Sequence, residues 1–136
     1  MMRVKTCFAA LAVVRDAETN SMSAFNILEA ITAVGLPFFM QNASFLVLWE
    51  RDADDPPRVA GRLTIAVGNQ ELSASAVNVD FEANLRNRTV INVNGLIVPS
   101  AGHLSFRIVL ENGVQAEYVV DVLAPPPNVQ VQAQRR

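Results

Sequence analysis

Apolar side chains recur at every second position along much of this chain. The clearest case lies near the C-terminus, where residues 104–110 alternate between Leu, Phe or Ile and more polar neighbours. A period of two places these apolar side chains on one face of a β-strand. Asn112-Gly113 follows, a dipeptide that suits a type I′ turn, and residues 116–122 then alternate again. We therefore predict a β-hairpin here.

A second hairpin is predicted in the middle of the chain. Residues 62–67 and 72–76 both alternate, and Gly68-Asn69 between them supplies a turn. The strand expected over residues 44–50 carries apolar side chains on both faces for part of its length, which favours a position in the centre of a sheet. Residues 89–98 predict a further strand, with a bulge or bend at Gly95.

Residues 24–34 fit two different periods. A helix is indicated by the spacing of Ile27, Leu28, Ile31 and Val34. A strand would place Phe25, Ile27 and Ile31 on one face and give a partner to the strand expected over residues 4–13. We predict the strand, with the helix as the alternative.

Together these segments give about seven or eight short strands separated by Gly, Pro, Asn and Asp. We predict an all-β fold, an antiparallel two-sheet sandwich that is Ig-like or jelly-roll-like. It would occupy residues 1–124 as one domain. Residues 125–136 are rich in Pro and Gln and are expected to form a C-terminal tail.

The composition indicates a folded protein and argues against nucleic acid and membranes as partners. Hydrophobic residues make up 51 % of the 136 residues and charged ones 18 %, which is enough apolar surface for one core. The net charge of -2 offers no general attraction for nucleic acid or anionic membranes, so we expect neither as a partner.

Arg3 and Lys5 before an apolar stretch imitate a secretion signal, but no cleavage pattern follows. We predict a cytoplasmic protein, with secretion as the alternative.

The sequence resembles a bacterial family of small β-sandwich proteins that is catalogued as a domain of unknown function (six-nine-four-one). The features that carry the resemblance are Asn26-Ile27-Leu28 with Ala30, Pro37-Phe38 before the strand at residues 45–48, the hairpin over residues 62–72, residues 102–106, Asn112-Gly113 and the closing strand before Pro125. The resemblance implies an all-β fold and assigns no activity or site residue. The acidic loop after residue 50 and the proline-rich tail depart from the family pattern.

Residues that could carry out catalysis are sparse. His103 is the one histidine and Cys7 the one cysteine, and nothing in their spacing brings them together. We interpret His103 as a histidine at the edge of a loop and Cys7 as a small core residue, and we keep a small hydrolase that uses His103 as an alternative function. Trp49 and Tyr118 occupy alternating strand positions, where packing in the core is expected. No cofactor motif is present, so none is predicted.

One acidic loop could hold a metal ion. Glu50, Asp52, Asp54 and Asp55 lie close together and are followed by Pro56-Pro57. Carboxylates at such spacing can bind calcium, although the glycine and the final glutamate of an EF-hand loop are missing. We interpret the loop as a solvated turn, and keep a calcium-assisted ligand-binding sandwich as the alternative. Asp16 and Glu18 would extend such a site if their loop lay at the same end of the sandwich.

The most suggestive apolar stretch is Leu36-Pro37-Phe38-Phe39-Met40, which we expect to form a loop. It could be an exposed contact surface, or it could plug one open end of the sandwich. We predict a non-catalytic protein-interaction or structural module, for which self-association into a homo-oligomer is the simplest case.

Overall fold

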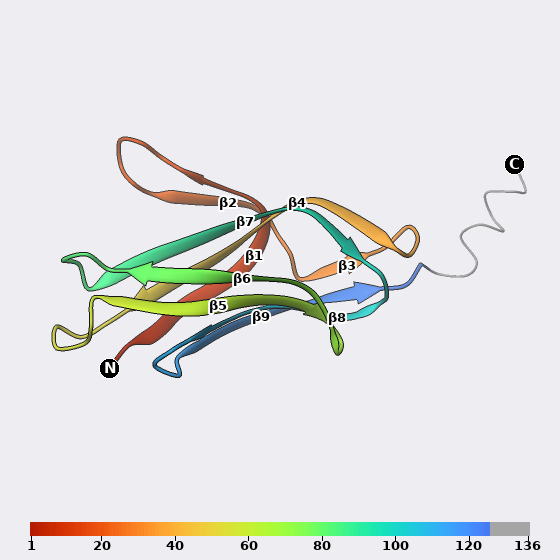
Figure 1. Cartoon of the computed structure of the whole chain (residues 1–136). Helices are drawn as coiled ribbons and strands as arrows, with labels where there is room; N and C mark the ends of the chain where they lie inside the picture. Colours follow the sequence, from red (N-terminus) through yellow and green to blue (C-terminus); the bar gives the residue numbers. More distant parts are fainter. Residues whose placement is uncertain (126–136) are drawn as a thin grey trace, which may run out of the picture.

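The computed structural model describes residues 1–125, which form two facing β-sheets (Figure 1). One sheet has the strand order β2-β1-β4-β7 and the other β3-β9-β8-β5-β6. The predicted all-β two-sheet sandwich is confirmed. The strands are β1 (Arg3–Arg15), β2 (Met22–Ile27), β3 (Ala30–Thr32), β4 (Phe38–Glu50), β5 (Arg58–Val67), β6 (Gln70–Asp80), β7 (Arg86–Val98), β8 (Gly102–Leu110) and β9 (Gln115–Leu123).

The nine strands exceed the expected number because residues 24–34 form two strands that lie in different sheets. β2 pairs with β1, as predicted, whereas β3 pairs in parallel with β9. Asn26, with a φ of 56°, precedes the break between the two strands. The helical alternative is therefore wrong. So is the shared face, because Phe25 is 53 % exposed on β2 while Ile31 packs against the core from the other sheet.

Both predicted hairpins are confirmed as β5–β6 and β8–β9. The type I′ turn is wrong, because only the glycine of Asn112-Gly113 has a positive φ. The amide of Gly113 donates to the carbonyl of Leu110, and the amide of Val114 donates to Asn112 Oδ1. A turn followed by a left-handed glycine is the usual geometry of a three-residue hairpin loop.

The core lies between β4 of one sheet and β5, β8 and β9 of the other. β4 is central, as predicted, with β1 and β7 on its two sides. The rings of Phe45 and Phe106 meet across the sandwich with centroids 5.6 Å apart. Trp49 is fully buried and donates through Nε1 to Thr89 Oγ1 at 3.0 Å, while the half-buried Tyr118 donates to the Leu28 carbonyl at 2.6 Å. The expectation that Trp49 and Tyr118 pack in the core is confirmed.

β4 and β7 change faces together at Gln41 and Gly95. Pairing keeps one register from Phe38–Val98 to Glu50–Arg86, so Gly95 marks a bend and not a bulge. On the longer side of this point the odd-numbered residues of β4, such as Phe45, face the core. On the shorter side the even-numbered residues do, and Met40 is buried. Gly95 has a φ of 76°, which a residue with a side chain adopts only with strain.

The second half of β1 leaves its sheet. Pairing with β4 stops at Ala10–Ser44, whereas pairing with β2 continues to Arg15–Met22. Residues 11–25 therefore form a hairpin arm that folds back over β7 (Figure 1). At the tip of the arm, Arg88 Nη1 donates to the carbonyl of Asn20 at 3.0 Å and joins the arm to β7.

Candidate functional site

The structure divides the predicted contact segment Leu36–Met40 into inward and outward residues. The expectation of a loop is wrong for Phe38–Met40, because these residues open β4 and pair with the end of β7. Met40 is 4 % exposed and Phe38 packs against the core. Leu36 and Pro37 are exposed, and Phe39 is 59 % exposed. Part of the segment plugs the sandwich and part of it faces outward.

Other exposed apolar side chains lie at the same end of the sandwich. Ile97 is opposite Phe39 on β7 and is 58 % exposed. Val34 and Leu123 are exposed too, and the amide of Ala33, next to Val34, donates to the carbonyl of Leu123. We call the following residues the apolar end: Val34, Leu36, Pro37, Phe39, Ile97 and Leu123. No Asp, Glu, Lys or Arg occurs between Glu29 and Glu50, or between Arg88 and Arg107.

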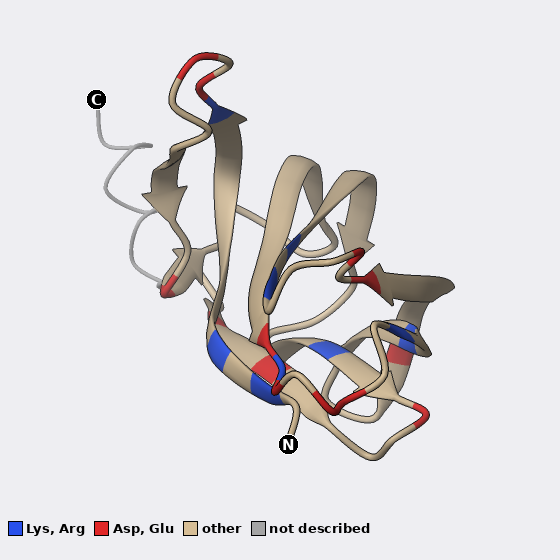
Figure 2. Cartoon of the chain, turned by 90° about the vertical axis from the view of Figure 1, so that its left-hand side faces the viewer, with Lys and Arg blue, Asp and Glu red and all other residues tan. Residues whose placement is uncertain are grey.

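The opposite end of the sandwich, the charged end, carries the acidic loop (Figure 2). Asp52, Asp54 and Asp55 lie together, with carboxylate oxygens within 4.8 Å of one another. The amino group of Met1 contacts both Asp52 and Asp55, and Arg3 Nη1 lies 3.3 Å from Asp52 Oδ1. The clustering of these aspartates is as predicted, but cationic groups of the chain already contact two of them. The binding of an ion stays a prediction.

Hydrogen bonds lower the pKa of three carboxyl groups at the charged end, those of Glu50, Asp52 and Asp55. The pKa of Asp52 is lowered mainly by the hydrogen bond from the amino group of Met1, and then by that from Arg3. The pKa of Asp55 is lowered mainly by the backbone amide of Asp52, which donates to Asp55 Oδ2 at 2.8 Å. The pKa of Glu50 is lowered mainly by Arg3, whose Nη2 lies 2.5 Å from Glu50 Oε1. All three side chains are held as carboxylates near neutral pH.

Arg51, which sequence reasoning missed, fastens the charged end together. Its side chain is buried, with the residue only 8 % exposed. Arg51 Nε donates to the carbonyl of Asn84 at 2.9 Å, and Nη1 donates to the carbonyl of Asp55 at 3.0 Å. The guanidinium carbon lies 5.5 Å from the ring centroid of Phe81. An arginine among acidic neighbours is usually a surface residue, so no sequence pattern indicates this role.

Asp16 and Glu18 do not join the acidic cluster. They lie at the tip of the hairpin arm, where Asp16 Oδ1 accepts hydrogen bonds from the amides of Glu18 at 2.8 Å and Thr19 at 3.2 Å. These two bonds, with that from Glu18 the larger cause, lower the pKa of Asp16. The Asp16 carboxylate therefore stabilises the turn in which it lies.

His103 and Cys7 do not form a pair. His103 is the second residue of β8, and its Nδ1 lies 2.8 Å from Asp121 Oδ1 with both side chains exposed. The half-buried Cys7 instead donates through Sγ to the carbonyl of Glu117 at 3.4 Å, and burial raises the pKa of its thiol. Cys7 packs against the core, as expected. His103 lies beside the carboxylate of Asp121 on the exposed surface of β8 and β9.

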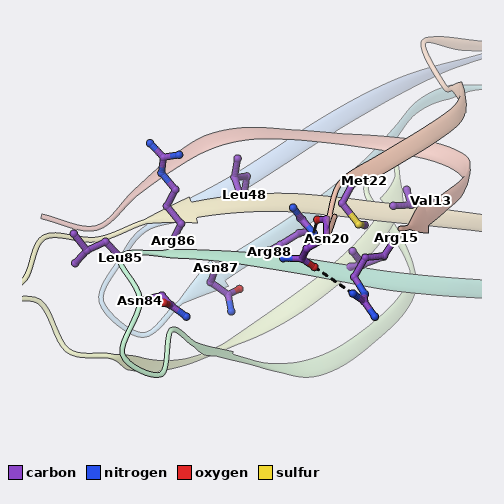
Figure 3. Close-up of a pocket in the computed structure, with 11 residues that line it drawn as sticks. Val13, Arg15, Asn20, Met22, Leu48, Asn84, Leu85, Arg86, Asn87 and Arg88 are labelled. Atoms are coloured by element: carbon purple, nitrogen blue, oxygen red, sulfur yellow. Dashed lines mark hydrogen bonds between the residues drawn. The ribbon is translucent and has the colours of Figure 1, made fainter. Parts of the chain in front are cut away.

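A cleft of about 1090 Å³ lies between the hairpin arm and the outer face of β4 and β7 (Figure 3). The residues that line it include three arginines, three asparagines and five apolar side chains, and neither Asp nor Glu is among them. The lining consists of Val13, Arg15, Asn20, Met22, Leu48, Asn84, Leu85, Arg86, Asn87, Arg88 and Val90. Sequence reasoning missed this cleft, because its walls come from three distant segments and no motif joins them.

Two of the three arginines in the cleft converge on Asn20. Arg15 Nη1 donates to Asn20 Oδ1 at 3.3 Å, and Arg88 Nη1 donates to the Asn20 carbonyl (Figure 3). Among the described residues, neither of these two guanidinium groups forms a salt bridge. Arg86 differs, since its Nε lies 3.1 Å from Glu50 Oε2.

Comparison with known proteins did not reveal a family. No family model matches the sequence, and no curated protein matches it either. The resemblance to the domain of unknown function (six-nine-four-one) therefore stays a prediction. Within residues 1–125, no helix has the length and hydropathy needed to cross a membrane.

Proposed function

We propose that this protein is a non-catalytic interaction module that self-associates through its apolar end. The observation that carries the proposal is the cross-strand pair of Phe39 and Ile97, two large apolar side chains that point outward and are more than half exposed. Contiguous apolar surface of this kind is typical of protein contacts. On sequence grounds we place the module in the cytoplasm, with a protein as its partner.

A second copy of the chain is the partner that this surface favours. A two-fold contact brings the same residues of both copies together, so a charged patch would oppose like charges. The apolar end avoids this penalty, because the chain around Phe39 and Ile97 carries no Asp, Glu, Lys or Arg. Full burial of a Phe or Ile side chain contributes roughly 1.5–3 kcal/mol, before the cost of association.

The alternatives have less support. Calcium at Asp52 and Asp55 would have to displace the amino group of Met1 and, at Asp52, Arg3. A hydrolase would have to use His103 and Asp121, which lie exposed on neighbouring strands and do not line the cleft.

Sedimentation velocity over a range of concentrations tests the proposal. The full chain should form dimers or larger species as its concentration rises, and the variant with Phe39→Thr and Ile97→Thr should stay monomeric. Phe25→Thr is the matched control, because Phe25 is 53 % exposed on a strand outside the apolar end. A wild-type chain that remains a monomer at millimolar concentration would refute the proposal. Loss of association in the Phe25 variant alone would also refute it.

A further inference from the structure

The cleft beneath the hairpin arm concentrates positive charge in a protein with a net charge of -2. Three arginines and no carboxylate line it, so its charge does not follow from the overall composition. Of the adjacent carboxylates, Glu50 pairs with one of the cleft arginines, Arg86, and Asp16 accepts hydrogen bonds from amides of its own loop. Among the described residues, Arg15 and Arg88 have no carboxylate as a salt-bridge partner.

Asn20 arranges these two arginines as a pair. It uses its side-chain oxygen for Arg15 and its backbone carbonyl for Arg88, so guanidinium groups from two different strands meet at one residue. Arg15 and Arg88 each use only Nη1 in these bonds to Asn20. A guanidinium group has five N–H donors in a planar fork. The donors that remain suit a carboxylate, which guanidinium groups bind in bidentate geometry.

The surroundings of the arginine pair favour a peptide over a small anion. Val13, Met22, Leu48 and Val90 give the cleft apolar walls that an inorganic anion would not use. A second hollow of about 330 Å³ shares Val13 and continues along β7 to Asn92 and Asn94. Its other polar residues are Asn42 and Ser44. Asparagine amides can both donate to and accept from a peptide backbone.

The length of this surface suits an extended chain. Arg86, Arg88, Val90, Asn92 and Asn94 alternate along β7 and line one or other of the two hollows. At about 3.3 Å per residue, the row from residue 86 to residue 94 spans roughly 26 Å, the length of about eight extended residues. No aromatic residue lines either hollow, so the surface lacks the stacking platforms that single-stranded nucleic acids require.

We propose that the cleft binds an acidic protein segment in extended conformation, with a carboxylate held between Arg15 and Arg88 and apolar side chains against Val13, Met22 and Val90. The cleft is separate from the apolar end, so peptide binding and self-association can be tested independently of each other.

Fluorescence anisotropy with a labelled eight-residue peptide of alternating Val and Glu tests this site. The wild-type chain should bind this peptide, and replacing every Glu of the peptide by Gln should weaken binding at least tenfold. Arg15→Gln should also weaken binding by about tenfold or more, because it removes one charge-assisted contact. This variant leaves the bond from Arg88 to the Asn20 carbonyl in place, so the arm should keep its position.

Arg107→Gln is the matched control, because Arg107 is an exposed strand arginine that donates to one amide oxygen, that of Gln115. It should leave the affinity unchanged, and melting temperatures will show that all variants are folded. Equal binding of the Gln peptide, or an Arg15 variant with wild-type affinity, would overturn the proposal. It would also be overturned by binding of a phosphoserine peptide or an oligonucleotide without binding of the Glu peptide.

Discussion

The two ends of the sandwich cover the hydrophobic core in different ways. At the charged end, the loops are bound to one another by Arg51, by Arg3 and by backbone hydrogen bonds, and a buried guanidinium closes the core. At the apolar end, Met40 closes the core from inside, but Phe39 and Ile97 remain outside without polar cover. The first end is complete within the chain, whereas the second leaves apolar surface for a partner.

The neighbouring residues Met40 and Phe39 should differ strongly in their contribution to stability, because one side chain is buried and the other is exposed. Met40→Ala should lower the free energy of unfolding by about 2–5 kcal/mol, because it removes a buried side chain and leaves a cavity. Phe39→Ala should lower it by less than about 1 kcal/mol when measured at low protein concentration. Urea unfolding followed by Trp49 fluorescence gives both values. Similar losses for the two variants would mean that β4 does not change faces at Gln41.

A second prediction concerns the charged end. Arg51→Ala should lower the free energy of unfolding by about 2–4 kcal/mol, because it removes a buried side chain together with its hydrogen bonds to the carbonyls of Asn84 and Asp55 and its contact with Phe81. Arg58→Ala is the control, since Arg58 forms an exposed pair with Asp80 and should contribute at most about 1 kcal/mol. If both substitutions have the same small effect, Arg51 does not hold this end together.

The third prediction is a smaller effect that depends on pH. The folded-state pKa values of Glu50, Asp52 and Asp55 are lowered, so their stabilising contribution is complete above the unfolded pKa values, near 4, and is lost as the pH falls through the folded ones. The urea midpoint should therefore fall from about pH 4 downward. Arg3→Gln should make this fall shallower and Phe39→Thr should not. A wild-type slope in the Arg3 variant would contradict this assignment.

Local sequence patterns were sufficient for much of the fold. The hairpin of β8 and β9 and the central position of β4 follow from alternation and turn residues, because both features depend on neighbours along the chain. The glycine at position 95 indicates a bulge or a bend for the same reason, and the unbroken register between β4 and β7 shows that it is a bend. The consequence of that bend was not recognised, because alternation in Phe38–Met40 is hidden when all three residues are apolar.

The candidate sites were less predictable, because they depend on contacts between distant segments. Asp52, Asp54 and Asp55 are close in the sequence, and their clustering was expected, whereas the contact with Arg3 was not. Arg15 and Asn20 lie in the same hairpin arm, but Arg88 is distant from both in the sequence. It meets them only because β1 leaves its sheet and folds over β7. Neither propensity nor spacing contains that information.

Hydrogen–deuterium exchange at low and high protein concentration tests the difference between the two ends most directly. If the apolar end is the contact between copies, amides of residues 33–39 and 95–98 should exchange more slowly at high concentration. Amides of residues 51–56 and 81–86 should exchange at the same rate in both samples. Concentration-dependent protection at residues 51–56, or none at residues 33–39, would contradict the account.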